Sequence, residues 1–361
     1  MSALLQKFII VLISATVLIV FIWCCTNQRQ PNNSSPSRKR WGSKPDGMCK
    51  ECRTVTTERD LMKMYNPWWR KKEDRSAEFR SNLTNKCNAV SKAIITQANT
   101  PVGKKVVYDG EKAKMEEVTR KLFSIFVKVS PFGNVTWETC AVVGNGGILS
   151  NSSCGQEIDS AQFVFRCNLP PLGKDFKKHV GNKTNLVTAN PSILLEKFEG
   201  LTERRRPFVE SMASYGDALL LIPAFSYTRN MAVSLRAAYT LEEFQSPART
   251  VFFSPSYLRS LAQFWKEQGL QVPRPSSGLI VASLALELCS EVRLYGFWPY
   301  PLHPDTHQTL TNHYYDNQQS MRTVHNMPAE FRHLLRLHSQ GVLRVHLGEC
   351  AARRAMSFYE V

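Results

Sequence analysis

Short apolar runs alternate with longer helical patterns over most of the chain beyond residue 76. The apolar runs are rich in Val, Leu, Ile and Phe, as expected for strands that are buried on both faces of a sheet. The predicted strands are Cys140–Val143, Phe163–Arg166, Leu186–Thr188, Ala218–Ile222, Thr250–Phe253 and Val292–Tyr295. Strands that alternate with helices in this way predict an α/β domain with a mostly parallel sheet.

Two helices are predicted from their terminal residues. One runs from Ser277 to Leu288, with Ser276 in the position of its N-cap. The other runs from Pro328 to His338, because proline suits the first turn of a helix and Gly341 lies just beyond the end.

The amino-terminal part predicts a membrane anchor. Phe8–Cys25 is a run of 18 uncharged, mostly apolar residues, long enough to span a thin bilayer. No small-residue cleavage site follows it, so an anchor is favoured over a cleaved signal peptide. The polar, proline-containing segment after it predicts a flexible stem. The predicted organisation is a tail (1–7), an anchor (8–25), a stem (26–75) and a folded domain (76–361).

The orientation of the anchor rests on two opposing signals. More basic residues follow the span than precede it, which by the positive-inside rule alone favours the reverse orientation. Ten cysteines and six glycosylation sequons indicate instead that the folded domain lies in an oxidising, luminal compartment. The sequons begin at Asn32, Asn33, Asn82, Asn134, Asn151 and Asn182, all after the span. We therefore expect a type II membrane protein.

The formal net charge is +16, from 46 basic and 30 acidic residues. A basic chain is able to bind nucleic acid, but a luminal address argues against that partner. A solvated basic surface accounts for most of the charge, and a share of it in a cleft would attract anionic substrates.

The segment after the first predicted strand carries candidate chemistry. It reads Gly144-Asn145-Gly146-Gly147, and glycines at the end of a strand allow a phosphate or sugar to approach the backbone amides. The spacing does not match G-x-G-x-x-G, which disfavours a dinucleotide cofactor. A nucleotide-binding loop and a plain tight turn both remain open from the residues alone.

Four segments in order resemble the motifs of the animal sialyltransferases. Cys140–Asn168 resembles the large sialylmotif, and Arg274–Leu279, continuing to Tyr295–Pro299, resembles the small one. His313-Tyr314-Tyr315-Asp316 resembles motif III, and His325–Glu330 resembles the very small motif, H-x4-E. The Arg166–Pro171 segment and the HYYD form are similar to the α-2,8 branch, and residues 186–300 look most like its mono- and oligosialylating types V and VI.

The resemblance implies a single GT-A-like, Rossmann-type catalytic domain that uses CMP-sialic acid as donor. It implies His325 as the general base. His313 is then the candidate for stabilising the CMP phosphate, and Glu330 the candidate for orienting the site. Asn145 and Asn168 match the family's donor-nucleotide asparagines. The further candidates for donor binding are Ser276, Ser277, Gly278, Trp298 and Tyr314. Ser277 departs from the family's usual threonine.

Each of these residues also has an ordinary structural interpretation. A loop histidine need not be catalytic, and Glu330 suits the first turn of any helix. The HYYD segment reads equally as a polar surface turn, asparagines are common in turns, and Trp298 reads as a core residue.

No D-x-D metal motif occurs anywhere in the sequence. Many sugar-nucleotide transferases use that motif to neutralise the leaving phosphate, so we expect histidine and hydrogen-bond donors to replace the metal, with no cofactor. A glycosyltransferase that uses a metal remains an alternative, which EDTA would decide.

The resemblance further implies disulfides Cys140–Cys289 and Cys154–Cys350. Cys49, Cys52 and Cys87 are left to pair internally or to cross-link a dimer. Zinc at Cys49 and Cys52 is disfavoured, since no second ligand pair follows at a suitable spacing.

The sequence therefore predicts an α-2,8-sialyltransferase of the Golgi membrane, acting on a sialylated glycolipid or glycoprotein. An inactive sialoglycan-binding protein of the same fold is the alternative, which the presence of both His313 and His325 disfavours. Residues 245–275 carry a net charge of only +3, which favours the addition of one or a few sialic acids over a long polymer.

Overall fold

The computed structural model describes residues 58–133, 135–318 and 325–350. The chain divides into Met1–Cys49 and Lys50–Val361, and all described residues belong to the second unit. The predicted anchor, Phe8–Cys25, lies outside them. Within the described ranges, no helix is both long and apolar enough to cross a bilayer.

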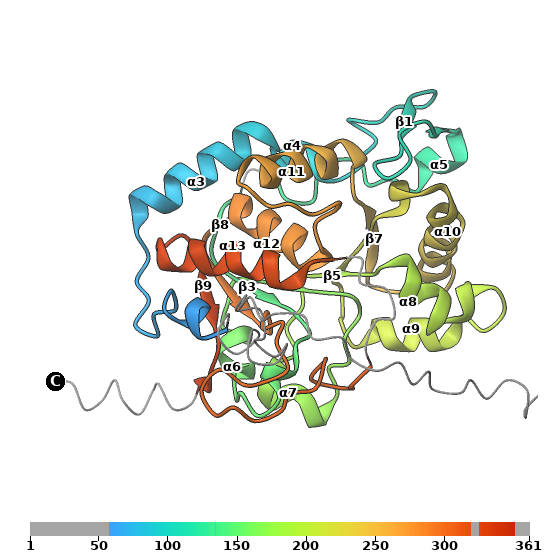
Figure 1. The fold of residues 1–361 in the computed structure, drawn as a ribbon. Helices are drawn as coiled ribbons and strands as arrows, with labels where there is room; N and C mark the ends of the chain where they lie inside the picture. Colours follow the sequence, from blue (N-terminus) through green and yellow to red (C-terminus); the bar gives the residue numbers. More distant parts are fainter. Residues whose placement is uncertain (1–57, 134, 319–324, 351–361) are drawn as a thin grey trace, which may run out of the picture. The chain divides into compact units, whose positions relative to one another are not determined.

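The centre of the domain is a sheet of seven parallel strands in the order β7-β6-β5-β4-β3-β8-β9 (Figure 1). The strands are β3 (Trp137–Val143), β4 (Phe163–Arg166), β5 (Leu186–Thr188), β6 (Leu219–Ile222), β7 (Arg249–Phe252), β8 (Cys289–Tyr295) and β9 (Arg344–His346). All six predicted strands are present. The unpredicted β9 is short, and two of its three residues are polar, so it lacks an apolar signal.

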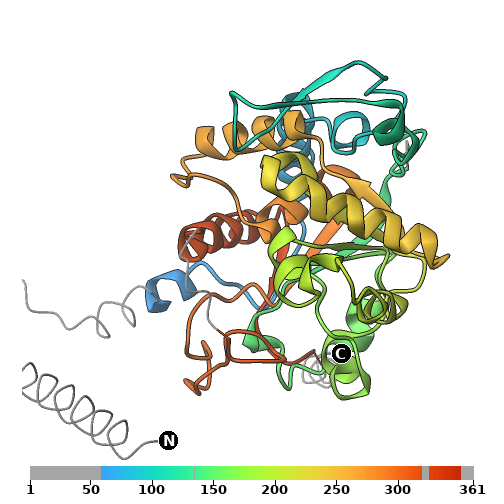
Figure 2. The same cartoon turned by 90° about the vertical axis from the view of Figure 1, so that its right-hand side faces the viewer.

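Helices cover both faces of this sheet (Figures 1 and 2). One face is covered by α3 (Glu73–Lys86), α4 (Ala89–Lys92), α11 (Pro255–Glu267), α12 (Ser277–Leu288) and α13 (Met327–Ser339). The other is covered by α5 (Arg120–Ser124), α6 (Gly155–Asp159), α7 (Lys174–Val180), α8 (Pro191–Glu196), α9 (Arg206–Ala213) and α10 (Thr228–Glu243). Because side chains alternate along a strand, Cys140 and Val142 join the first core, whereas Ala141 and Val143 join the second.

The two predicted helices are confirmed. The helix α12 has the predicted bounds, and the Ser276 hydroxyl accepts a hydrogen bond from Leu279 N at 3.2 Å as its N-cap. The helix α13 begins one residue before Pro328, and the Asn326 side chain caps it. A hairpin of β1 (Lys105–Val107) and β2 (Met115–Glu117) lies outside the main sheet.

Two disulfides join distant parts of the chain. They are Cys140–Cys289, between β3 and β8, and Cys154–Cys350, the two pairings that the resemblance implies. Cys87 is a free and fully buried thiol, which corrects the expectation that it pairs with Cys49 or Cys52 or links a dimer. Burial raises the pKa of this thiol to about 12, so it stays protonated and unreactive.

The packed domain begins before the expected boundary at residue 76. Leu61 is buried in the main core, and Tyr65 stacks on His338 with ring centroids 5.0 Å apart. Trp69 Nε1 donates to the carbonyl of His338 at 3.0 Å. The part of the predicted stem from 58 to 75 is therefore attached to α13, because its aromatic and apolar side chains find partners that composition does not reveal.

Candidate active site

The motif residues gather at the carboxyl ends of the parallel strands. The chain order along the sheet reverses between β3 and β8, and in open α/β sheets ligands bind at such a switch point. Asn145 follows β3, Asn168 follows β4, and Gly296 follows β8. Asn190 follows β5 at the same edge, a residue that the sequence analysis missed.

The glycines of the first motif bring protein segments together. Gly144 N donates to Tyr295 O at 2.7 Å, and Gly146 N donates to Gly296 O at 3.0 Å. A Cβ on Gly147 would lie 2.0 Å from the Thr311 carbonyl oxygen. The expectation that these amides are free for a phosphate is therefore wrong at Gly144 and Gly146. The glycines allow close approach of β8 and of the segment before His313.

Asn145 joins two of the motifs and keeps one unused acceptor. Its side-chain Nδ2 donates to Cys167 O at 2.8 Å, and its backbone carbonyl accepts from Tyr314 N at 2.9 Å. Its Oδ1 is buried and has no hydrogen-bond partner in the part of the chain that the structure describes. Buried polar atoms are nearly always paired, so this oxygen suits a donor group on a ligand.

A chain of hydrogen bonds connects the ends of β4 and β5 to the start of α12. Asn168 Oδ1 accepts from Asn190 N at 3.0 Å, and Ser277 Oγ donates to Asn190 Oδ1 at 2.9 Å. Asn168 adopts a left-handed backbone conformation with φ +61°, which asparagine tolerates better than most residues. The three side chains thus form one polar rim at the edge where nucleotides bind in such folds.

Ser276 and Glu330 form a buried pair that links the small and very small motifs. Ser276 N donates to Glu330 Oε1 at 2.8 Å, and its hydroxyl donates to the other carboxylate oxygen. Burial raises the pKa of Glu330, while the bonds from Ser276 oppose that shift. Both groups are more than nine-tenths buried and already paired, so they position α12 against α13. This corrects the expectation that the Ser276 side chain binds the donor.

His325 is held as a proton acceptor. It is half-buried, and its Nδ1 donates to the Arg274 carbonyl at 3.2 Å, so the lone pair of the neutral ring lies on Nε2. Burial lowers the pKa of His325; the carbonyl bond opposes this shift and the Arg274 charge adds to it. The neutral imidazole is therefore the stable form near neutral pH, as a general base requires.

His313 has a different partner. Its Nδ1 donates to Asp316 Oδ1 at 2.8 Å, and its ring stacks on Tyr315 at 5.0 Å. A bridge between His313 and Gly146 places motif III against the glycine segment. The Asp316 carboxylate orients the His313 ring, and the ring Nε2 lies 3.5 Å from Asn312 Nδ2.

Two predicted donor-binding side chains are occupied by packing. The Trp298 ring is buried against Tyr300 and Phe331, and its Nε1 donates to Leu302 O at 2.6 Å. Tyr314 is buried, and its hydroxyl donates to Pro171 O at 2.6 Å. Both side chains therefore support the walls of the site, in line with the structural interpretation of Trp298. Gly278 faces Phe297, which a Cβ would approach to 3.1 Å.

A possible ligand set for a metal, Cys154, His346 and Cys350, is present among the described residues. The two sulfurs form a disulfide, so they offer no thiolate to an ion.

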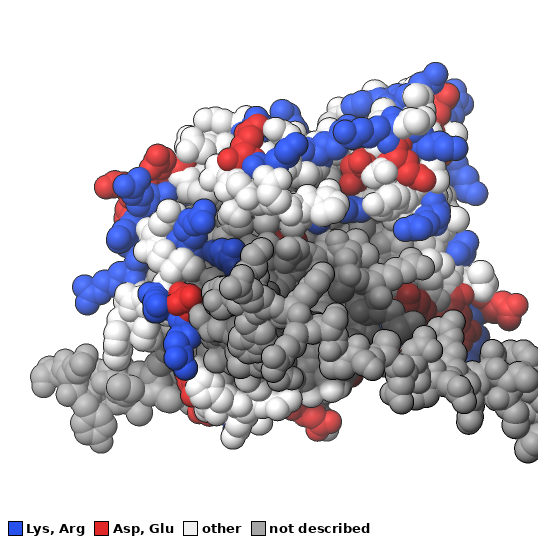
Figure 3. Space-filling view, in the orientation of Figure 1, with Lys and Arg blue, Asp and Glu red and all other residues white. Residues whose placement is uncertain are grey.

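Figure 3 shows Lys and Arg spread over one face, gathering over the corner of β1, β2 and α5 with acidic residues among them. The charge on this face is mostly a solvated surface.

Comparison with known proteins gives a consistent family. The model of glycosyltransferase family 29 (sialyltransferase) matches residues 94–342. Human alpha-2,8-sialyltransferase 8F is 44% identical over 78% of this chain and 71% of its own length, and human 8E is 44% identical over 78% and 75%. A bovine alpha-N-acetylneuraminide alpha-2,8-sialyltransferase is 41% identical over 78% and 79%. A mammalian sialyltransferase crystal structure matches 81% of this chain and 86% of its own, at 19% identity and TM-score 0.43. The chain belongs to glycosyltransferase family 29, the sialyltransferases.

Proposed function

We propose that this chain transfers sialic acid from CMP-sialic acid to the 8-hydroxyl of a terminal sialic acid on a glycolipid or glycoprotein. The observation that carries the proposal is the 44% identity to relatives named alpha-2,8-sialyltransferases over more than three quarters of the chain. The meeting of all four motifs at one edge of the sheet supports it.

In the proposed mechanism His325 acts as the base of a single inverting displacement. The acceptor 8-oxygen attacks the anomeric carbon while its proton passes to His325 Nε2, since Nδ1 is bound to Arg274 O. The bond between the anomeric carbon and the phosphate oxygen breaks, and CMP leaves with the electron pair. Preorganised donors that face this developing charge supply much of the catalysis.

His313 stabilises the leaving phosphate in this mechanism. Its ring, oriented by Asp316, would donate to the phosphate from the segment that lies against Gly146. No metal is needed if this donor neutralises the phosphate, which fits the lack of a D-x-D motif in the sequence. The polar rim of Asn168, Asn190 and Ser277 would then hold the nucleoside part.

We also propose that the chain is a type II protein of the Golgi membrane with its catalytic domain in the lumen. Its apolar segment at 8–25, the sequons and the two disulfides support this placement. Disulfides of this kind persist in oxidising compartments.

Transfer assays with the full-length chain test the activity. CMP-sialic acid would be supplied with a sialylated ganglioside or a sialylated glycoprotein, with and without EDTA, and the product linkage determined. We expect an α-2,8 linkage that EDTA does not prevent. Transfer abolished by EDTA would contradict the metal-free mechanism, and CMP binding without transfer to either acceptor would favour the inactive, glycan-binding alternative.

A further inference from the structure

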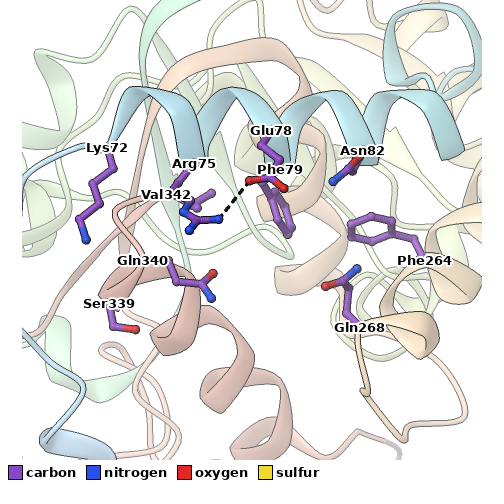
Figure 4. A pocket seen from close by; sticks show the side chains of 10 residues that line it. All are labelled: Lys72, Arg75, Glu78, Phe79, Asn82, Phe264, Gln268, Ser339, Gln340 and Val342. Atoms are coloured by element: carbon purple, nitrogen blue, oxygen red, sulfur yellow. Dashed lines mark hydrogen bonds and ion pairs between the residues drawn. The ribbon is translucent and has the colours of Figure 1, made fainter.

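A cavity of about 450 Å³ lies away from the strand ends, between α3, α11 and the end of α13 (Figure 4). None of the motif residues lines it. Its volume falls within the usual range for small-molecule pockets, about 300–1,000 Å³. The cavity therefore has the size of a binding site without a role in the proposed reaction.

One of its lining residues is a glycosylation acceptor. Asn82 begins the sequon Asn82-Leu83-Thr84, and its side chain is exposed at the cavity. Phe79 lies three residues earlier on α3, so both side chains project from the same face of the helix. A glycan attached to Asn82 would thus start at the cavity.

The lining suits a neutral sugar. The ring of Phe79 is partly exposed and meets the buried Phe264 edge-on, with centroids 5.6 Å apart, so Phe79 offers an apolar surface on which the C–H face of a sugar ring packs. Amides of Gln268 and Gln340 offer both donors and acceptors at the rim. Arg75 is paired with Glu78 at 3.2 Å, and Lys72 adds a further positive charge to the lining.

We propose that this cavity holds the first sugars of an N-linked glycan carried by Asn82. The inference rests on the luminal placement proposed above, and it extends to a site separate from the reaction. Sugars bound there would connect α3 with α11 and the end of α13, and so stabilise the amino-terminal helix on the domain. The chemistry at His325 would be unaffected.

The test uses the full-length chain produced in animal cells that attach N-glycans. Glycopeptide mass spectrometry would measure the occupancy of Asn82, and thermal unfolding would compare the wild type with Asn82→Gln, Phe79→Leu and the double variant. We expect Asn82 to be occupied and Asn82→Gln to lower Tm by about 2 °C without changing kcat/KM. In the Phe79→Leu protein, Asn82→Gln should lower Tm by less than half as much as it does in the wild type.

Two controls separate the glycan from the side chain. Asn85→Gln changes an exposed amide on the same helix outside the cavity and is expected to leave Tm unchanged. Trimming each glycan to its first sugar should preserve most of the stabilisation, because that sugar lies nearest the Phe79 ring.

Three results would overturn the proposal. The first is an Asn82 that carries no glycan while other sequons do. The second is that the effects of Asn82→Gln and Phe79→Leu on Tm are fully additive. The third is that a sialylated oligosaccharide raises the Tm of the Asn82→Gln protein and that this rise requires Phe79. The last result would assign the cavity to the acceptor. A chain with no glycan at any sequon would instead contradict the luminal placement, so the two failures are distinguishable.

Discussion

His325 and His313 lie in two motifs of the same site, yet their surroundings differ. The Nδ1 of His325 donates to a backbone carbonyl, and a proton on Nε2 would create a charge near Arg274. The Nδ1 of His313 donates to the Asp316 carboxylate, which fixes the orientation of the ring. The same side chain is thus bound to an uncharged backbone carbonyl in one place and to a carboxylate in the other.

This difference indicates a division of labour that neither motif reveals by itself. A base must accept a proton, and a phosphate-stabilising group must offer one. The partner of Nδ1, a carbonyl for His325 and a carboxylate for His313, distinguishes the roles that the two rings fit. The predictions below test whether the two histidines are as unlike as their partners imply.

The largest effect is expected from His325→Ala. Loss of a positioned general base should lower kcat by about 10²–10⁴-fold, with the Kd for CMP little changed. Steady-state kinetics and calorimetric CMP binding measure both quantities. His307→Asn, in an exposed loop position with φ +55°, is the matched control and should retain full activity. Equal losses in the two variants would contradict the assignment.

His313→Ala should cost about 10²–10³-fold in kcat, the effect of losing one donor to developing charge. Asp316→Asn keeps an acceptor for Nδ1 but removes the negative charge of the carboxylate, so a smaller loss of about tenfold is expected. Single-turnover rates at saturating donor would measure the chemical step. If Asp316→Asn were as damaging as His313→Ala, the carboxylate would have a direct role that its geometry does not suggest.

Ser276→Ala tests the scaffold beneath both motifs. It removes the N-cap of α12 and leaves a buried Glu330 oxygen without its donor, which should destabilise the domain by about 2 kcal/mol. Thermal unfolding would detect the change. Ser211→Ala, on the helix α9, is the control expected to unfold like the wild type. An unchanged Tm would remove the positioning role of the Ser276–Glu330 pair.

The smallest effect is expected from Ser277→Thr, which restores the residue usual in the family. The hydroxyl that donates to Asn190 is retained, so the KM for CMP-sialic acid should change by no more than about twofold, well below the ~1.4 kcal/mol of a tenfold effect. Ser277→Ala provides the contrast, with a larger rise in KM. Equal KM values for all three proteins would show that this hydroxyl does not contribute to donor binding.

Sequence patterns predicted most of the fold, because the central strands are apolar on both faces and α12 has a clear cap. They missed β9, which is short and polar, and placed the domain boundary too late, because the packing of Tyr65 and Trp69 on His338 is a long-range contact. Local patterns do not encode which distant helix such residues meet.

For the site, residue identity was easier to predict than residue role. Ser276 is fully paired with Glu330, and the Trp298 ring is a core residue. Asn190 was missed, although an asparagine two residues after a predicted strand was a usable signal. Whether a polar side chain faces the ligand or another side chain depends on pairing across motifs more than fifty residues apart.

The pH dependence of kcat/KM tests the central claim most directly. Since the pKa of His325 is lowered, its neutral form should prevail above that value, and kcat/KM should rise with pH along a limb whose midpoint lies below about 6.5, the ordinary histidine value. His325→Ala should lack this rising limb. A rate that falls as pH increases from about 5 to 7, or a rising limb that persists in His325→Ala, would contradict the assignment of His325 as the base.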